Sequence, residues 1–310
     1  MHSSPPKSFS PAPRALVGIP SLLAALLHPG PASGQEWSSP RLTAMANAQR
    51  ASASGTDALF ANPGGLSFPG AYFGEVGYAD DFRETDRRIH VSLADSAINQ
   101  IVSGGVAFTY GRARPIGSSD DSVLLEGYRL DAGVALKGGD SFGIGIAVRG
   151  FDYNRLVDGQ FADDQSRDLG EVSFDIGFQW IINENFRIGV VGENLTNPER
   201  TELPLTVGGG LAFSYEAFTV EGNGFWENLP GPDRGQLALG ASFVIAKLVP
   251  IRAGALYDFL EEEVGLSGGL GIQAGRVAFE AAYQARVANA SDFRDDDERL
   301  FVSSLRIQLF

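Results

Sequence analysis

Apolar and polar residues alternate with a period of two along most of the chain after residue 71. The segment Leu205–Tyr215 shows the pattern clearly. One set of alternate positions holds Leu205, Val207, Leu211, Phe213 and Tyr215, and the other holds Thr206, Gly208, Gly210, Ala212 and Ser214. Such alternation between turns is typical of β-strands, each with one apolar face.

The same rule yields about 14 strand candidates along the rest of the chain. Their lengths suit tilted membrane strands of about 9–11 residues. Short connections face one side and mostly longer loops face the other, which is typical of an outer-membrane barrel. We therefore predict an all-β fold, a transmembrane antiparallel β-barrel of about 14 strands. The candidates are 72–79, 87–94, 103–112, 127–137, 141–151, 170–182, 185–194, 204–216, 217–227, 235–246, 250–259, 262–274, 276–287 and 299–310.

The apolar phase of these strands is expected to face lipid, and the opposite phase a polar lumen. Charges of both signs fit a lumen, because an Arg or Lys at the bilayer midplane costs about 2–4 kcal/mol. A water-soluble β-sandwich also alternates and is the alternative fold. The expected lipid-facing residues include Phe142, Ile144, Ile146, Val148, Val172, Phe174, Ile176, Phe178, Trp180, Leu237, Leu239, Phe243, Ile245, Val277, Phe279, Tyr283 and Val287. The expected lumen residues include Glu75, His90, Arg129, Asp131, Arg149, Asp175, Arg187, Glu193, Glu221, Arg252, Asp258, Glu280, Arg286 and Arg306.

The N-terminal segment 1–34 has the features of a secretory signal peptide. Lys7 and Arg14 supply positive charge, and the apolar run 15–27 is too short to span a bilayer as a helix. Small residues at 32–34 offer a cleavage site before Gln35. A poorly ordered N-terminal tail is the alternative.

Residues 35–71 are rich in small side chains and lack the alternation of the later chain. We expect this segment to be an N-terminal plug, or hatch, containing a short helical turn. Thr56 is expected to cap that turn, and Pro63 and Gly64 to end it. The barrel then comprises residues 72–310.

The composition narrows the class of protein further. The chain has no cysteine, which excludes a lipoprotein anchor, a disulfide framework and a Cys-ligated metal. The net charge is −14, and it becomes two units more negative without residues 1–34, so binding to nucleic acid is not expected. We predict no cofactor and no metal.

Acidic clusters gather on the connections expected to face outward. They are Asp80-Asp81, Asp120-Asp121, Asp163-Asp164, Glu261-Glu262-Glu263 and Asp295-Asp296-Asp297. They are either solvated loop tips or groups that hold divalent cations against the phosphates of lipopolysaccharide. Outer-membrane lipid and lipopolysaccharide are therefore expected partners.

The chain ends in an aromatic residue, Phe310, on its final expected strand. This end resembles the signal read by the outer-membrane barrel assembly machinery, which is a further expected partner. Phe310 lies out of phase with Leu305, Ile307 and Leu309, so the match to that signal is imperfect.

Catalytic motifs are weak in this chain, and we predict that it is not an enzyme. His90 is the only histidine after the signal segment, and one histidine cannot form a multi-histidine metal site. Residues 265–269 match Gly-x-Ser-x-Gly, but that motif needs a strand-to-helix elbow and here lies inside an alternating strand.

The segment Asp57–Leu66 resembles the Asn-Pro-Ala plug motif of the FadL-like family, with Asn62, Pro63 and then Gly64 in place of alanine. This family of outer-membrane proteins includes long-chain fatty-acid and hydrocarbon transporters, and related barrel proteins of the type IX secretion system. A barrel of about 14 strands with a small N-terminal plug agrees with the family's architecture.

The resemblance implies passive uptake of hydrophobic small molecules across the bacterial outer membrane. Asn62 and Pro63 are then expected to shape the hatch, and Phe60 and Leu66 to line an apolar pocket for the ligand. The alternative is a structural or secretion-associated barrel without transport, whose lumen should be filled by paired charges.

Overall fold

The computed structural model describes residues 37–68, 70–81, 87–99, 101–113, 123–157, 160–161, 168–196, 204–229, 233–260, 262–287 and 299–309. The expected signal segment 1–34 and Phe310 lie outside the described residues. Three of the acidic pairs and triplets, at 120–121, 163–164 and 295–297, also lie outside them.

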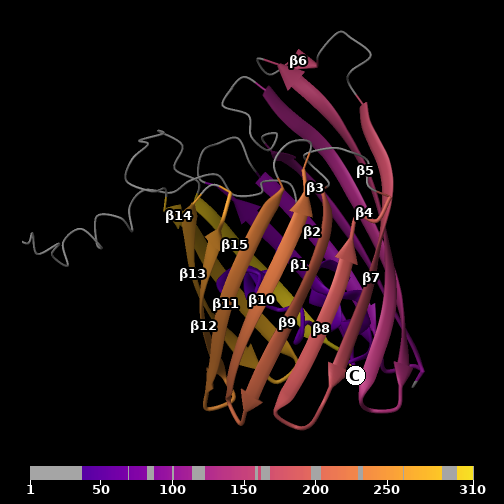
Figure 1. Cartoon of the computed structure of the whole chain (residues 1–310), viewed down its shortest axis with the longest axis vertical. Coiled ribbons are helices and arrows are strands. Elements are labelled where there is room, and N and C mark those ends of the chain that lie inside the picture. The colour runs from indigo at the N-terminus through magenta and orange to yellow at the C-terminus, as the bar shows by residue number, and fades with distance from the viewer. Residues whose placement is uncertain are drawn as a thin grey trace, which may run out of the picture.

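The described strands form one closed antiparallel barrel of 14 strands, which confirms the predicted fold class (Figure 1). Each strand pairs with its neighbours in sequence, and the first strand pairs with the last. A short strand, β6, pairs only with the outer end of β5 and is not part of the wall. The strands are β1 (Tyr72–Asp80), β2 (Arg87–Asp95), β3 (Val102–Ala113), β4 (Val123–Gly138), β5 (Phe142–Val157), β6 (Gln160–Phe161), β7 (Asp168–Ile181), β8 (Phe186–Glu193), β9 (Leu205–Tyr215), β10 (Phe218–Asn228), β11 (Arg234–Ile245), β12 (Val249–Asp258), β13 (Glu263–Ala274), β14 (Val277–Val287) and β15 (Arg299–Gln308).

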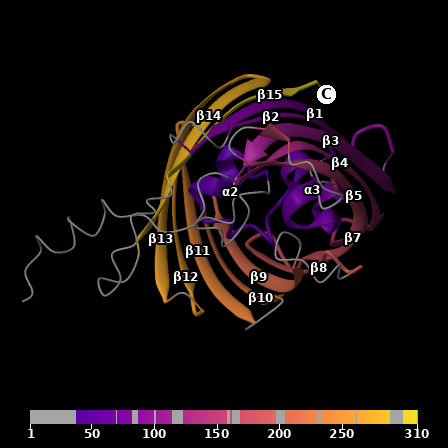
Figure 2. The same ribbon diagram turned by 90° about the horizontal axis from the view of Figure 1, so that it is seen from above.

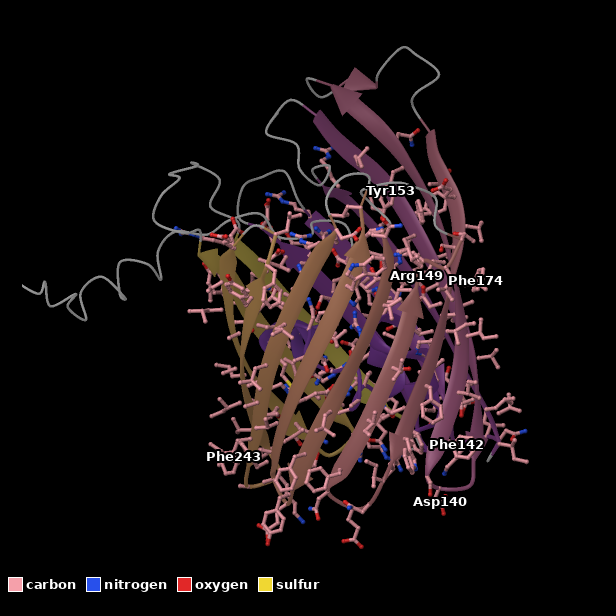
Figure 3. All side chains as sticks on the ribbon, in the orientation of Figure 1. Asp140, Phe142, Arg149, Tyr153, Phe174 and Phe243 are labelled. Carbon is pink, nitrogen blue, oxygen red and sulfur yellow. The ribbon has the colours of Figure 1, made fainter. Side chains whose placement is uncertain are left out.

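The two phases of each strand face opposite sides of the wall, as the alternation predicts. Figure 3 shows Phe142, Phe174 and Phe243 pointing away from the barrel. Val172 is 64% exposed on the outside of β7, whereas its lumen-facing neighbour Ser173 is 1% exposed. This apolar exterior is the surface that a bilayer would cover.

Three strands extend further than predicted at the end with the long loops. β4, β5 and β7 rise above the other strands (Figure 1), and β5 pairs with β7 as far as Asn154 and Asp168. The predicted loop 152–169 is therefore too long. The backbone ladder continues where apolar alternation stops, because strand pairing requires backbone hydrogen bonds rather than an apolar face.

The later connections at the opposite end are tight turns, as predicted. Gly139, Glu216 and Gly275 adopt positive φ angles of 62°, 52° and 61° in three of them. The β13 strand begins at Glu263, which is 8% exposed. The acidic cluster at 261–263 therefore does not lie wholly on a loop, because its last residue faces the lumen.

Residues 37–68 lie inside the barrel, and we call this segment the hatch (Figure 2). It contains α2 (Pro40–Ala44), η1 (Gly55–Asp57), α3 (Ala58–Ala61) and η2 (Pro63–Ser67). The predicted cap at Thr56 is wrong, because Thr56 lies inside η1 and its hydroxyl donates to Glu75 instead. Ser39 caps α2 by accepting from the amide of Leu42 at 3.3 Å. Among the described residues, none of the helices has the length and apolar character that crossing a bilayer would require.

Candidate functional site

Asn62 anchors the hatch to the barrel wall. Its Nδ2 donates to the carbonyl oxygens of Arg50 in the hatch at 2.7 Å and of Phe178 on β7 at 2.9 Å. Its Oδ1 accepts from the amide of Gly64 at 3.1 Å, which caps η2. Pro63 follows as the first residue of η2, where a missing N–H costs nothing. The side chain thus shapes the hatch and binds the wall at once.

Glycines on the wall make room for the hatch backbone beside Asn62. A methyl group on Gly177 of β7 would meet Cδ of Pro63 at 2.6 Å, closer than real side chains approach. Gly145 and Gly143 of β5 face the carbonyl groups of Pro63 and Gly64 in the same way. The hatch backbone at Pro63 and Gly64 therefore packs directly on β5, and the Asn62 side chain lies directly against Gly177 of β7.

Further round the lumen, Gly240 faces Met45 and Gly269 faces Ala44, as expected for glycines that accommodate a plug. Gly208 and Gly210 lie in the same wall but do not face the hatch. There the nearest atoms belong instead to the wall side chains Phe225 and Asn223.

Leu59 and Leu66 form an apolar contact between the hatch and β3–β4. Both are almost fully buried, at 0% and 2% exposure. Their methyl groups lie over Gly105 and Gly133, two glycines on neighbouring strands. Leu66 was predicted to line an apolar pocket, and in the structure it lies in this closely packed contact.

An aromatic cluster lies on the β1–β2 side of the hatch. The rings of Trp37 and His90 stack with centroids 4.3 Å apart and planes 6° apart. The ring of Phe60 meets His90 edge-on at 5.3 Å. Nδ1 of His90 lies 2.9 Å from the hydroxyl of Thr109, and the guanidinium of Arg129 lies 5.6 Å from the Phe60 ring. Phe60 therefore lies between an aromatic surface and a charged one.

Arg41 is the centre of a buried charged cluster between the hatch and the wall. Its guanidinium pairs with Asp57 at 2.5 Å, with Glu75 of β1 at 2.8 Å and with Glu280 of β14 at 2.5 Å. Arg252 of β12 also pairs with Glu280, at 2.8 Å. Burial disfavours the charge of Arg41, but the three carboxylates raise its pKa well above the ordinary value. The cation therefore stays charged in the lumen.

Two further sets of ion pairs line the lumen. Arg129 and Asp131 pair at 2.7 Å on β4, and Arg149 of β5 reaches Asp175 of β7 at 2.6 Å. Arg149 also donates to the carbonyl of Phe60 at 3.4 Å. Next along the wall, Arg50 of the hatch pairs with Glu193 of β8 at 2.9 Å and lies over the ring of Phe225. Paired charges therefore hold the hatch on several sides.

The four predicted hatch residues all lie inside the lumen, but they separate into three contacts. Asn62 and Pro63 lie on the glycines of β5 and β7, Leu66 on β3–β4, and Phe60 beside His90. Phe60 and Leu66 are 7% and 2% exposed. Their predicted role in binding a ligand remains a prediction.

Sequence reasoning missed Trp37 and Arg41, and predicted for His90 only a place in the polar lumen. The signal for Arg41 was a charged side chain among small residues in a segment expected to lie inside the barrel, which is unusual unless the charge is paired. Within the described part of the chain, no group of three or more His, Cys, Asp or Glu side chains is placed to hold a metal ion. Ser267 of the Gly-x-Ser-x-Gly pattern lies in the middle of β13 and donates to the carbonyl of Ala44.

No protein-family model and no curated protein sequence matches the chain. Solved structures do match its fold. The chain is similar to a FadL homologue of Pseudomonas aeruginosa, with 13% identity, 88% of this chain and 98% of that chain covered, and a TM-score of 0.65. It is also similar to the monoaromatic hydrocarbon channel CymD, with 13% identity, 87% and 96% covered, and a TM-score of 0.67.

The toluene transporter TbuX of Ralstonia pickettii is a third similar structure, with 12% identity, 89% and 99% covered, and a TM-score of 0.63. The chain therefore has the FadL-like fold, a closed 14-stranded barrel with an N-terminal hatch in its lumen.

Proposed function

We propose that the protein takes up small hydrophobic molecules passively across the bacterial outer membrane. The observation that carries this proposal is the apolar and aromatic surface that the hatch brings into a polar lumen. Trp37, Leu59, Phe60 and Leu66 belong to one buried cluster, whereas the facing wall carries paired charges. A hydrocarbon entering this lumen would find its large apolar partners on the hatch, next to small wall residues of the same cluster such as Ala107 and Ala135.

The similar structures support the same class of substrate. Their names describe transporters of toluene and channels for monoaromatic hydrocarbons. Phe60 is the best candidate to contact a ligand, because it is the hatch aromatic that also touches His90 and Arg129. Replacing it changes the apolar surface without removing a hydrogen-bonding side chain.

The place of the protein in the cell belongs to the same proposal. The barrel exterior suits a bilayer, and segment 1–34 would direct export. Outer-membrane lipid and lipopolysaccharide would surround the wall, and the assembly machinery would recognise the end at Phe310. The supporting observations are the apolar exterior of the wall, the tight turns at the end opposite the long loops, and the fold shared with hydrocarbon channels and transporters.

Native mass spectrometry of the barrel, purified from outer membranes in mild detergent, tests the proposal. Toluene and a long-chain fatty acid serve as probes, added separately. We expect the wild-type barrel to retain at least one probe, Phe60→Asp to lose it, and the matched control Phe60→Leu to keep it. A wild-type barrel that retains neither probe would contradict hydrophobic uptake.

A structural or secretion-associated barrel without transport is the second candidate. The ion pairs of Arg41, Arg50 and Arg149 around the hatch favour it, since a permanently filled lumen should contain such pairs. The same purification discriminates between the two functions. A stoichiometric co-purifying protein, with no probe bound, would favour this second function.

A further inference from the structure

The pairing of β1 with β15 is the seam that closes the barrel. Its partners lie far apart in the chain, for example Glu75 opposite Arg306 and Ala79 opposite Val302. Bringing such distant segments together costs more chain entropy than forming any hairpin of the wall. A contact that bridges this seam from the lumen therefore has a larger loss of chain entropy to offset than a contact between strands that are neighbours in sequence.

The hatch bridges the seam with a charged cluster. Arg41 binds Glu75 on β1, on one side of β15, and Glu280 on β14, on the other side. Thr56 of the hatch adds a hydrogen bond to Glu75 at 2.5 Å. Because these side chains are 2–4% exposed, dissolved salt screens the attraction between them much less than it screens an exposed ion pair.

An apolar contact of the hatch covers the same seam higher up. Trp37 shares a buried cluster with Ala79 of β1 and Val302 of β15, which are direct cross-strand partners. Gly77 of β1 makes room for the indole, since a methyl group there would meet Cζ2 of Trp37 at 2.5 Å. Two independent contacts of the hatch, one charged and one apolar, thus lie over one strand pair.

We propose that the hatch is a clasp on the closing seam, in which Arg41 holds β1 and β14 together across β15. Hatch docking and barrel closure are then one cooperative event. The α2 end of the hatch then stays fixed to the wall whether or not the barrel holds a bound molecule. A hatch that only blocked the lumen could be anchored anywhere on the wall, with no preference for the first and last strands.

The test compares two buried hatch arginines of similar exposure. Arg41→Met removes the charged clasp at the seam, whereas Arg50→Met removes the pair with Glu193 on β8, on the other part of the wall. Both variants take a cation away from buried carboxylates, so both should lower the midpoint of thermal unfolding in detergent, by roughly 10 °C. The loss of stability alone therefore does not separate a clasp from an ordinary ion pair.

A disulfide across the seam distinguishes a clasp from an ordinary ion pair. It can be introduced without competing thiols because the natural chain has no cysteine. Val76→Cys with Leu305→Cys links two direct partners of β1 and β15 on the outer face. The control link, Val220→Cys with Ala241→Cys, joins β10 to β11. The clasp predicts that the seam link restores at least half of the lost midpoint in Arg41→Met and much less in Arg50→Met, while the control link restores neither.

Equal rescue of both arginine variants by the seam link, or no rescue of Arg41→Met, would overturn the proposal. If Arg41→Met does not fold at all, the readout becomes the yield of heat-modifiable folded barrel on electrophoresis, with and without the seam link. Glu280→Gln, which keeps the shape of the clasp and removes one charge, should follow Arg41→Met in every arm.

Discussion

The side-chain amide of Asn62 in the hatch donates to the backbone carbonyl of Phe178 in the barrel wall, at 2.9 Å. Phe178 points its ring to the outside of the wall, and its direct partner on β8 is Val190. Asn62 thus binds the backbone of Phe178 from inside the barrel, whereas the side chain of Phe178 faces the outside. Because Asn62 also caps η2 and binds Arg50, the shape of the hatch and its position in the lumen are coupled.

Asn62→Asp tests this coupling. The aspartate can still accept from Gly64, but it loses the bonds donated to Arg50, Phe178 and Val190 and places an acceptor against three carbonyl groups. Because Asn62 is fully buried, we expect a loss of about 2–3 kcal/mol in the free energy of unfolding. Thermal unfolding in detergent measures it. Asn228→Asp, at the outer end of β10, is the control and should change stability by less than about 0.5 kcal/mol.

Gly177→Ala should disturb the docking of the hatch, whereas Gly150→Ala should not. A methyl group at Gly177 collides with Pro63, while at Gly150 no atom lies within 4 Å. The two residues lie in neighbouring strands of the wall, so replacing glycine by alanine should change the conformational entropy of the backbone equally in both. We expect a loss of about 1–3 kcal/mol for Gly177→Ala and little change for Gly150→Ala. Similar stabilities of the two variants would refute direct packing of the hatch on glycine.

Leu66→Ala should open a cavity between the hatch and β3–β4. Because Leu66 is 2% exposed, we expect a loss of about 2–5 kcal/mol. Leu239→Ala makes the same chemical change on the outside of β11, where the side chain is 58% exposed, and should cost much less in detergent. If Leu66 also lines a ligand pocket, the variant should change probe retention in native mass spectrometry, which Leu239→Ala should leave unaltered.

Ile146→Arg places a charge on the outer face of β5, in the middle of the wall. We expect a cost of about 2–4 kcal/mol when the barrel is folded into lipid vesicles, because a charge at the midplane is poorly solvated. Ile98→Arg places the same charge on the β2–β3 turn, where Ile98 is 78% exposed, and should be nearly neutral. Equal costs in the two positions would contradict the assignment of β5 to the membrane.

The alternation of residues such as Phe142, Ile144 and Ile146 was sufficient to predict both the strand and its outer face. The reason is that alternation is a local property, since successive side chains in any strand point to opposite sides. The outer ends of β4, β5 and β7 were missed because the alternation stops there, as in Val123–Leu125, while the backbone ladder continues. Thr56 was assigned the wrong role because its hydroxyl found a buried carboxylate, Glu75, from a distant segment.

The candidate site was predictable only in part, for the same reason. Asn62 and Pro63 carried a recognisable motif, and their place in the hatch followed from it. Trp37 and Arg41 carried none, because their roles depend on wall residues that lie far away in the chain. Arg41 and Glu280 are 239 positions apart and meet only after the barrel has closed.

The sequence by itself determined the strands, the two faces of the wall, the segment that forms the hatch and the resemblance to FadL-like proteins. The strands, the faces and the hatch segment follow from periodicity and composition, and the resemblance rests on the short motif at Asp57–Leu66. All of these are properties of a few neighbouring residues. The tertiary structure alone decided which charges pair in the lumen, where the hatch rests on glycine and which strands Arg41 joins. Those contacts depend on strand register and barrel closure, since a shift by one residue would turn every lumen side chain outward.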